Sequence, residues 1–308
     1  MKVMCLGAGA LGGYFGGRLA EAGVDVTFLV RPARKRQLAE RGLRIESPFG
    51  DFAGPVRAIT AEEIAGAPDV ILLACKAYDL PSAMDAIRPA MGPATAVLPI
   101  LNGIAHMDVL NEAFGPERVL GGVAKIAATL APDGTIRHLN DWRYIVFGEQ
   151  DGTVSPRVRA LKEAFDRTSV VATVSTDIRR ALWEKLVHLA TVAGMTCLMR
   201  ASVGEIARAP GGTDLMTRFL EANAAVAAQA GYPPSAEFLD PFRAMFTDRD
   251  SPYTSSMLRD LERGGPIEAD HIVGFMLDKA RAFGLDESLH AIVFAHLKAY
   301  EARRAARA

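Results

Sequence analysis

The chain has 308 residues, 50% of them hydrophobic and 23% charged, with a formal net charge of −1. This is the composition of an ordinary globular protein, and the length predicts two domains. A near-neutral balance gives no support for a nucleic-acid or membrane-surface partner. No apolar run approaches a transmembrane span, and the N-terminus enters a strand without a signal peptide, so we expect a cytoplasmic protein.

The N-terminal stretch predicts the first β-α-β unit of a dinucleotide fold. A buried strand over residues 2–6 leads into Gly7-Ala8-Gly9-Ala10-Leu11-Gly12, and a small-residue helix follows over residues 13–22. Gly7 permits the tight turn, Gly9 lets the backbone approach a pyrophosphate, and Gly12 allows close helix–strand packing. The pyrophosphate would lie at the helix N-terminus, where N–H groups and the helix dipole favour an anion.

The end of the second strand, residues 24–30, predicts which cofactor binds. An NAD enzyme usually places Asp or Glu there for the ribose hydroxyls, whereas an Arg accommodates a 2′-phosphate. This chain has Arg31, and Arg34, Lys35 and Arg36 open the next helix. Cations at a helix N-terminus oppose the helix dipole, so the cluster is locally unfavourable. A solvated basic helix start is the alternative, and we favour NADPH.

The rest of the first half continues the α/β pattern. We expect a hairpin around residues 48–51, strands at 69–75, 96–101, 119–130, 135–139, 144–147 and 170–174, and helices at 79–91, 106–114 and 154–166. Asp133-Gly134 predicts a turn that makes its part of the sheet antiparallel. Lys76 and Asn102 each follow a core strand, as Gly7 and Arg31 do. Ligands bind at the carboxyl ends of parallel strands, so these positions predict one site, with solvated loop residues as the alternative.

From residue 177 onward the chain is helix-periodic. We therefore predict an α/β fold with a Rossmann-type dinucleotide-binding domain at residues 1–176, followed by an all-α domain at residues 177–308. The expected helices cover residues 178–199, a short stretch behind a capping box at 202–205, and residues 213–231, 235–247, 255–263, 266–283 and 287–305. Three cysteines, Cys5, Cys75 and Cys197, match neither a metal site nor a disulfide framework and indicate a reducing compartment.

The first helix of the second half is apolar on nearly all faces, which is typical of a buried helix. Lys185 lies in its middle, and a buried ammonium is costly unless it is paired, so we take it as a candidate functional residue, with a solvated lysine as the alternative. For His188, on the same face, we favour a hydrogen-bonded core histidine. Ser255, Ser256 and Glu268 each lie where a helix opens, and capping and dipole preferences account for them without a function.

Together these features resemble the ketopantoate reductase (2-dehydropantoate 2-reductase) family. The matching elements are Gly7 to Gly12, Arg31, Cys75-Lys76-Ala77, Asn102-Gly103, Leu182-Trp183-x-Lys185-Leu186, Ser255-Ser256-Met257-Leu258-x-Asp260 and Ile267-Glu268-x-Asp270-x-Ile272-x-Gly274. The resemblance implies a Rossmann domain, a helical domain and an active site between them. It also implies NADPH-dependent reduction of a 2-oxo acid to a 2-hydroxy acid, ketopantoate to pantoate in pantothenate biosynthesis. The partner is then a small molecule, and a homodimer is left open.

The resemblance also implies a role for each matching position. Gly7, Ala8, Gly9, Ala10, Leu11 and Gly12 would cradle the pyrophosphate, Arg31 would meet the 2′-phosphate, and Lys76, Asn102, Glu268 and the backbone of Ala127 would contact the cofactor. Lys185 would protonate the carbonyl oxygen as hydride arrives, because the developing alkoxide needs a positioned acid. Ser256 and Asn102 would hold the substrate, and Glu268 would keep Lys185 oriented.

The substrate half departs from the family pattern. The family has asparagines four and eight residues after the lysine, where this chain has Leu189 and Ala193. Two further family asparagines are replaced by Val203 and Tyr253. A site discriminates through the groups that hydrogen-bond its substrate, so the loss predicts a different, more apolar 2-oxo acid or ketone. His188 and Tyr253 are candidates to replace some of these contacts.

Two alternatives remain for the function. One is a non-catalytic NADPH-binding sensor or scaffold, and retention of both Lys185 and Glu268 argues against it. The other is a 3-hydroxyacid or 6-phosphogluconate-type dehydrogenase, which also joins a Rossmann domain to a helical domain and uses a lysine on a helix. The order of the Ser255-Ser256 and Ile267-Glu268 motifs argues against this second alternative.

Overall fold

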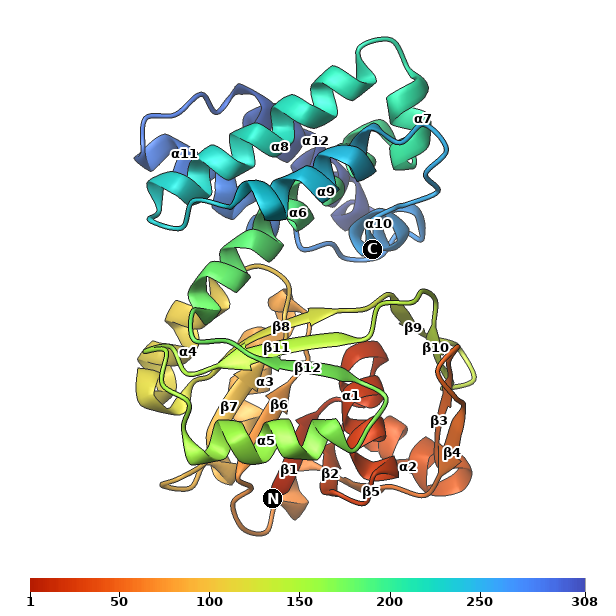
Figure 1. The fold of residues 1–308 in the computed structure, drawn as a ribbon. Helices are drawn as coiled ribbons and strands as arrows, with labels where there is room; N and C mark the ends of the chain where they lie inside the picture. The colour runs from red at the N-terminus through yellow and green to blue at the C-terminus, as the bar shows by residue number, and fades with distance from the viewer. Residues whose placement is uncertain (308) are drawn as a thin grey trace. The chain divides into compact units, whose positions relative to one another are not determined.

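The chain divides into two compact units. The computed structural model describes residues 1–307 (Figure 1). The first unit comprises Met1–Leu101 and His106–Ala181, and the second comprises Asn102–Ala105 and the residues from Leu182 onward. The first is α/β and the second is helical, which confirms the predicted fold class. The boundary after residue 176 stays a prediction.

A five-stranded parallel sheet is the largest sheet of the first unit. Its strands lie in the order β5 (Arg57–Ile59), β2 (Asp25–Leu29), β1 (Lys2–Leu6), β6 (Val70–Leu73) and β7 (Ala96–Pro99). β1 pairs with β2 on one side and β6 on the other, so Val3 lies between Val26 and Val70. Every residue of β6 and β7 is buried, as in parallel sheets covered on both faces.

Helix α1 (Ala10–Glu21) lies close to two sheets because its contact positions are glycines. A Cβ atom added at Gly16 would come within 2.5 Å of Cys5 Sγ in β1. One added at Gly13 would overlap the side chain of Ile136 in β10 (Ile136–His138). Such close packing fixes the N-terminus of α1 beside the carboxyl end of β1.

The remaining strands form two smaller sheets, ordered β4-β3-β10-β9 and β12-β11-β8. Their bounds are β3 (Leu43–Glu46), β4 (Phe52–Gly54), β8 (Gly121–Lys125), β9 (Ala128–Leu130), β11 (Tyr144–Gly148) and β12 (Val171–Val174). The single strand expected over residues 119–130 is wrong. The stretch is interrupted at Ile126-Ala127, where the Asn140 side chain accepts a hydrogen bond from the Ala127 N–H. The two resulting strands, β8 and β9, join different sheets. The antiparallel pair around Asp133-Gly134 is confirmed, but it lies outside the parallel sheet.

The other helices of the first unit are shorter. They are α2 (Pro32–Arg41), α3 (Leu80–Ile87), α4 (His106–Phe114) and α5 (Pro156–Asp166), with 3-10 turns η1 (Ala61–Glu63), η2 (Ala77–Asp79), η3 (Arg88–Ala90) and η4 (Pro116–Arg118). The helix expected over residues 79–91 is confirmed as α3, and its last turn is the 3-10 turn η3. The 3-10 turn that follows α3 contains Pro89, which has no N–H to continue the α-helical ladder.

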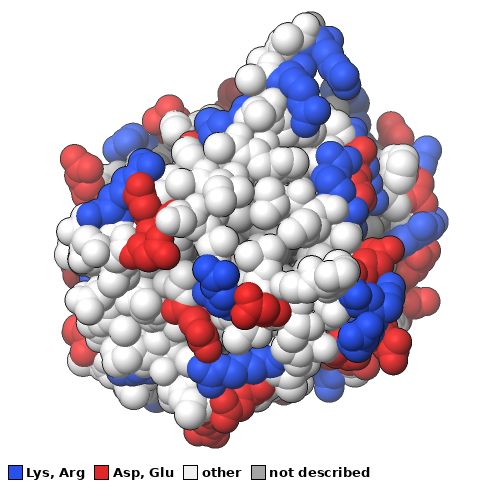
Figure 2. All heavy atoms as spheres, turned by 90° about the horizontal axis from the view of Figure 1, so that it is seen from above, with Lys and Arg blue, Asp and Glu red and all other residues white. Residues whose placement is uncertain are grey.

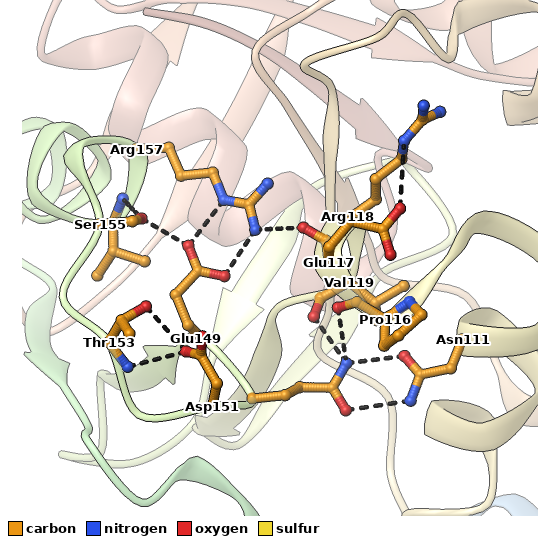
Figure 3. Close-up of polar contacts among 12 residues, drawn as sticks. Asn111, Pro116, Glu117, Arg118, Val119, Glu149, Asp151, Thr153, Ser155 and Arg157 are labelled. Atoms are coloured by element: carbon orange, nitrogen blue, oxygen red, sulfur yellow. Dashed lines mark hydrogen bonds and ion pairs between the residues drawn. The ribbon is translucent and has the colours of Figure 1, made fainter.

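A polar network joins the loop before α5 to α4 and to the turn η4 that follows it (Figure 3). The Glu149 carboxylate accepts hydrogen bonds from the Ser155 hydroxyl (2.5 Å) and from Arg157 Nε (2.8 Å) and Nη2 (2.6 Å). The Gln150 amide exchanges two hydrogen bonds with the amide of Asn111, at 2.7 and 3.1 Å. Glu149 is only 7% exposed, so losing Arg157 would leave a buried, uncompensated charge.

The second unit is built around α6 (Ile178–Met199), which enters it at Leu182. The other helices are α7 (Val203–Arg208), α8 (Gly212–Gln229), α9 (Ala236–Thr247), α10 (Ser256–Glu262), α11 (Phe275–Ala282) and α12 (Ser288–Ala305). The predicted capping box of α7 is confirmed at Ser202 and Glu205. The helix expected over residues 266–283 is wrong in its first part. A π-helical turn, Asp270–Gly274, precedes α11, and π turns occur mostly as single inserts, often at functional sites.

Surface charge is mixed on the face shown in Figure 2. Most Lys and Arg lie in small groups beside Asp and Glu around a broad uncharged area, and one basic group at the upper edge of the view has no acidic neighbour there. This distribution matches the net charge of −1 and is unlike the basic footprint of nucleic-acid-binding surfaces. Among residues 1–307, no helix is both long and apolar enough to cross a bilayer.

A buried polar chain crosses the core of the helical unit. His290 Nε2 lies 3.1 Å from Asn223 Oδ1, and Asn223 Nδ2 donates to Thr191 Oγ1 on α6 (3.1 Å). Asn223 donates through both amide hydrogens, so its oxygen accepts and His290 carries its proton on Nε2. Burial lowers the pKa of His290 to about 4, against the opposing effect of Asp286 and Glu287.

This lowered pKa predicts loss of stability in acid. Histidine in an unfolded chain has a pKa of about 6.5. Between about pH 7 and about pH 5 this residue therefore becomes protonated in the unfolded state, whereas His290 in the folded state stays neutral. We expect the free energy of unfolding of the helical unit to fall by about 2 kcal/mol over that interval through His290 alone. Urea unfolding at both pH values measures this loss. His290→Gln keeps an N–H donor toward Asn223 and does not titrate, so an equal loss in both proteins would contradict the prediction.

Candidate cofactor and catalytic sites

The turn between β1 and α1 leaves open space at the helix N-terminus. Gly7 has φ +90°, and its N–H donates to Leu29 O (2.9 Å). A Cβ atom added at Gly7 or Gly9 would meet nothing within 4 Å, whereas one at Gly12 would overlap the Gly7 carbonyl oxygen. Gly12 is therefore needed for packing, and Gly7 and Gly9 border free space. Backbone N–H groups facing such a space suit a pyrophosphate.

Arg31 lies at the end of β2 as the N-cap of α2. Its side chain is 83% exposed, and Nη2 lies 3.9 Å from the Asp79 carboxylate. An exposed ion pair at that distance contributes little to stability, so the guanidinium can turn toward a phosphate at low cost. Bidentate guanidinium–phosphate pairing would then be available at the position where the ribose of a dinucleotide is recognised.

Arg34 has a different role from the one that the cationic cluster suggested. Its Nε and Nη2 donate to Ala8 O at 3.1 and 2.9 Å, and Nη2 also donates to Gly134 O (3.1 Å). Lys35 pairs with Glu63. Arg34 thus ties α2, and with it Arg31, to the glycine turn and to the β9–β10 turn. Sequence reasoning missed this clamp because its acceptors are backbone carbonyls, which leave no mark in a sequence.

Two further predicted cofactor residues lie in the first unit. Lys76 lies three residues after the end of β6, as the N-cap of η2, and it is half-buried. The Ala127 N–H donates to Asn140 Oδ1 (3.0 Å), and its carbonyl accepts from the Leu139 N–H (2.7 Å). A cofactor contact by the Ala127 backbone would therefore use the second lone pair of its carbonyl oxygen. Both assignments stay predictions.

Asn102 belongs to the helical unit, although it follows β7 in the chain. Its Nδ2 donates to Glu268 Oε2 at 3.4 Å, and Glu268 is only 4% exposed. Gly103 has φ +83°, and a Cβ atom there would lie 2.7 Å from His271 O. The Asn102–Ala105 loop thus packs directly on the segment that carries Glu268. The structure brings these two predicted site residues together, in a different unit from Gly7, Arg31 and Lys76.

The remaining candidates lie on α6 and α10. Lys185 is half-buried among the buried side chains of α6. Ser255 caps α10, because its Oγ accepts from the Leu258 N–H (3.0 Å), and it also shares a hydrogen bond with Thr196 Oγ1 (2.9 Å). The capping explanation therefore belongs to Ser255. Ser256, the first residue of α10, is half-buried and is not used as the cap.

His188 is hydrogen-bonded, as expected, with Nε2 3.2 Å from the Tyr253 hydroxyl. The α6 face that carries Lys185 therefore meets the loop before α10. Burial raises the pKa of Tyr253 to about 12, so its phenol stays protonated and can donate to the imidazole. The sequence offered His188 and Tyr253 together as candidate substrate contacts, and the structure adds the hydrogen bond between them.

Two family models match most of the chain. Residues 3–152 match "Ketopantoate reductase PanE/ApbA", and residues 177–301 match "Ketopantoate reductase PanE/ApbA C terminal". An uncharacterized oxidoreductase of Bacillus subtilis (YkpB) is 37% identical over 99% of this chain and 100% of its own length. A 2-dehydropantoate 2-reductase of Mesorhizobium japonicum is 31% identical over 91% of this chain and 92% of its own length.

Solved structures show the same fold. A PanE/ApbA family ketopantoate reductase from Ralstonia eutropha has a TM-score of 0.88 and 28% identity, over 99% of this chain and 100% of that one. A ternary structure of D-mandelate dehydrogenase with NADH and anilino(oxo)acetate has a TM-score of 0.87 at 21% identity, over 99% of this chain and 100% of that one. The second likeness concerns the fold alone.

Proposed function

Because the chain belongs to the ketopantoate reductase family of NADP-dependent oxidoreductases, we propose that it reduces a 2-oxo acid to the 2-hydroxy acid with NADPH. The observation that supports this best is the open glycine turn at the N-terminus of α1, with exposed Arg31 at the end of the adjacent strand. Gly7 to Gly12 would hold the pyrophosphate and Arg31 the 2′-phosphate. Lys76, Ala127, Asn102 and Glu268 would complete the cofactor contacts.

The helical unit would supply the acid. When bound, the reduced nicotinamide provides a hydride to the carbonyl carbon of the 2-oxo acid. Lys185 Nζ would donate a proton to the carbonyl oxygen, which stabilises the negative charge developing there. Asn102 and Glu268, already in contact, would orient Lys185 and the substrate. Ser256 would donate its hydroxyl to the substrate.

The test is turnover of purified protein with a panel of 2-oxo acids, followed through the near-ultraviolet absorbance of the reduced nicotinamide. We expect kcat/KM with NADPH to exceed that with NADH. Arg31→Ala should raise the KM for NADPH about 10- to 100-fold, the equivalent of one charge-assisted phosphate contact, and leave the KM for NADH unchanged. Arg36→Ala, which removes another exposed cation of α2, is the matched control.

Other outcomes identify the alternatives. Cofactor binding without turnover of any carbonyl compound would favour a sensor or scaffold. Turnover of 3-hydroxyacids alone would favour the other dehydrogenase class. The proposal makes a small molecule the partner of this chain, and a homodimer is an expectation that size-exclusion chromatography tests.

A further inference from the structure

Four aromatic rings of the helical unit form a stack beside the candidate acid. The stack consists of His188 on α6, Phe242 and Phe246 on α9, and Tyr253 in the loop before α10. The imidazole of His188 lies 4.3 Å from the Phe242 ring at 24°, 5.8 Å from Phe246 at 9° and 6.0 Å from Tyr253 at 4°. These are the separations and angles of offset-stacked rings.

The stack lies where the substrate residues are expected. His188 follows Lys185 by three residues on one face of α6, and Tyr253 precedes Ser256 by three residues. The ring contact and the 3.2 Å hydrogen bond between His188 and Tyr253 therefore join the two elements that carry Lys185 and Ser256. A substrate held by both residues would have its substituent next to these rings.

The loop that carries Tyr253 is held by hydrogen bonds from the N-terminus of α7. The Val203 N–H donates to Tyr253 O (2.9 Å), and the Gly204 N–H donates to Ser251 O (2.9 Å). A Cβ atom added at Gly204 would come within 2.7 Å of Ser251 O, so glycine allows the loop to lie directly on α7. Phe246 is fully buried, while His188, Phe242 and Tyr253 keep part of their surface exposed. The stack thus presents pre-organised ring surface, which lowers the entropic cost of binding.

We propose that this stack receives the substituent of the 2-oxo acid and selects an aromatic one, with Tyr253 as the specificity-determining residue. The inference rests on the proposed function and names its substrate class. A planar ring gains stacking contacts with His188 and Tyr253. The hydroxyl of a substrate such as ketopantoate would either face ring carbon atoms or compete with the His188–Tyr253 hydrogen bond, and a polar group buried without a partner is rejected strongly.

The experiment compares phenylglyoxylate, ketopantoate and 2-oxoisovalerate with NADPH at saturation. We expect kcat/KM for phenylglyoxylate to exceed both others by about tenfold or more. Tyr253→Asn, which removes the ring, should lower kcat/KM for phenylglyoxylate about tenfold and shrink its ratio to ketopantoate. Tyr253→Phe keeps the ring and should keep the preference. Tyr232→Phe is the control, because Tyr232 packs on Trp183 and does not belong to the four-ring stack, so this variant should keep the preference.

The outcomes separate this inference from the function on which it rests. Efficient reduction of ketopantoate or 2-oxoisovalerate, with a substrate ratio that Tyr253→Asn does not change, would overturn the aromatic specificity and leave the proposed reduction standing. No turnover of any 2-oxo acid would overturn both. Binding of phenylglyoxylate to the NADP⁺-loaded protein, measured calorimetrically, gives a second readout. It should weaken in Tyr253→Asn but not in Tyr253→Phe, and equal binding by both variants would contradict the inference.

Discussion

Replacing Lys185 with methionine is expected to lower kcat about 10²- to 10⁴-fold, the contribution typical of a positioned general acid. Methionine keeps most of the apolar stem of lysine, and α6 is already packed by the buried side chains of Leu182, Leu186 and Val187. The variant should therefore fold and should bind the cofactor normally. The measurement is kcat and the KM for NADPH on the best 2-oxo acid of the panel.

The control for this prediction is Lys279→Met, which removes another half-buried lysine of the helical unit. Its turnover should stay within about twofold of the parent enzyme, because Lys279 is not one of the candidate site residues and its ammonium lies over the Phe275 ring. Lys185→Ala should regain part of its activity when a small primary amine is added, because the amine can occupy the vacated space and supply the proton. Full turnover in Lys185→Met would show that the proton comes from elsewhere.

Local sequence signals predicted the nucleotide half well. The strand, glycine turn and helix from Lys2 to Glu21 follow from rules that act over a few residues, namely buried runs, turn chemistry and close packing. The same holds for the capping box at Ser202 and the turn at Gly134, whose φ of +89° suits glycine. Such features depend on the backbone of their own segment, and the tertiary fold preserves them.

The features that were missed depend on contacts between distant segments. Periodicity could not show that the strand is interrupted at Ala127, because the Ala127 N–H donates to the side chain of Asn140, thirteen residues further along the chain. It could not show that Asn102, which follows a strand of the parallel sheet, belongs to the helical unit. Nor could it show that the Arg34 guanidinium donates to the carbonyl of Ala8. The candidate site was predicted as a set of positions, mostly through a family resemblance. The pairing of His188 with Tyr253 came from the structure.

The glycine turn permits a prediction that separates folding from cofactor binding. An alanine at Gly12 would place its Cβ against the Gly7 carbonyl oxygen, and its nearest other neighbour would be Ala74 Cβ at 3.2 Å. Backbone cannot yield as a flexible side chain does, and overpacking of this kind costs about 1–3 kcal/mol. We expect Gly12→Ala to lower the Tm of the protein without cofactor by about 5 °C.

Gly9→Ala is the matched variant and should show the opposite behaviour. Gly9 has φ −83° and ψ −161°, which any residue adopts, and its added Cβ meets no protein atom within 4 Å. The apo protein should therefore keep its Tm, whereas the methyl group would occupy the space in which the pyrophosphate approaches the backbone. We expect the Kd for NADPH to rise about 10- to 100-fold, and the increase in Tm caused by NADPH to shrink accordingly. If Gly9→Ala bound NADPH as tightly as the parent protein, the phosphates could not lie against this turn, and the free space at the N-terminus of α1 would need another explanation.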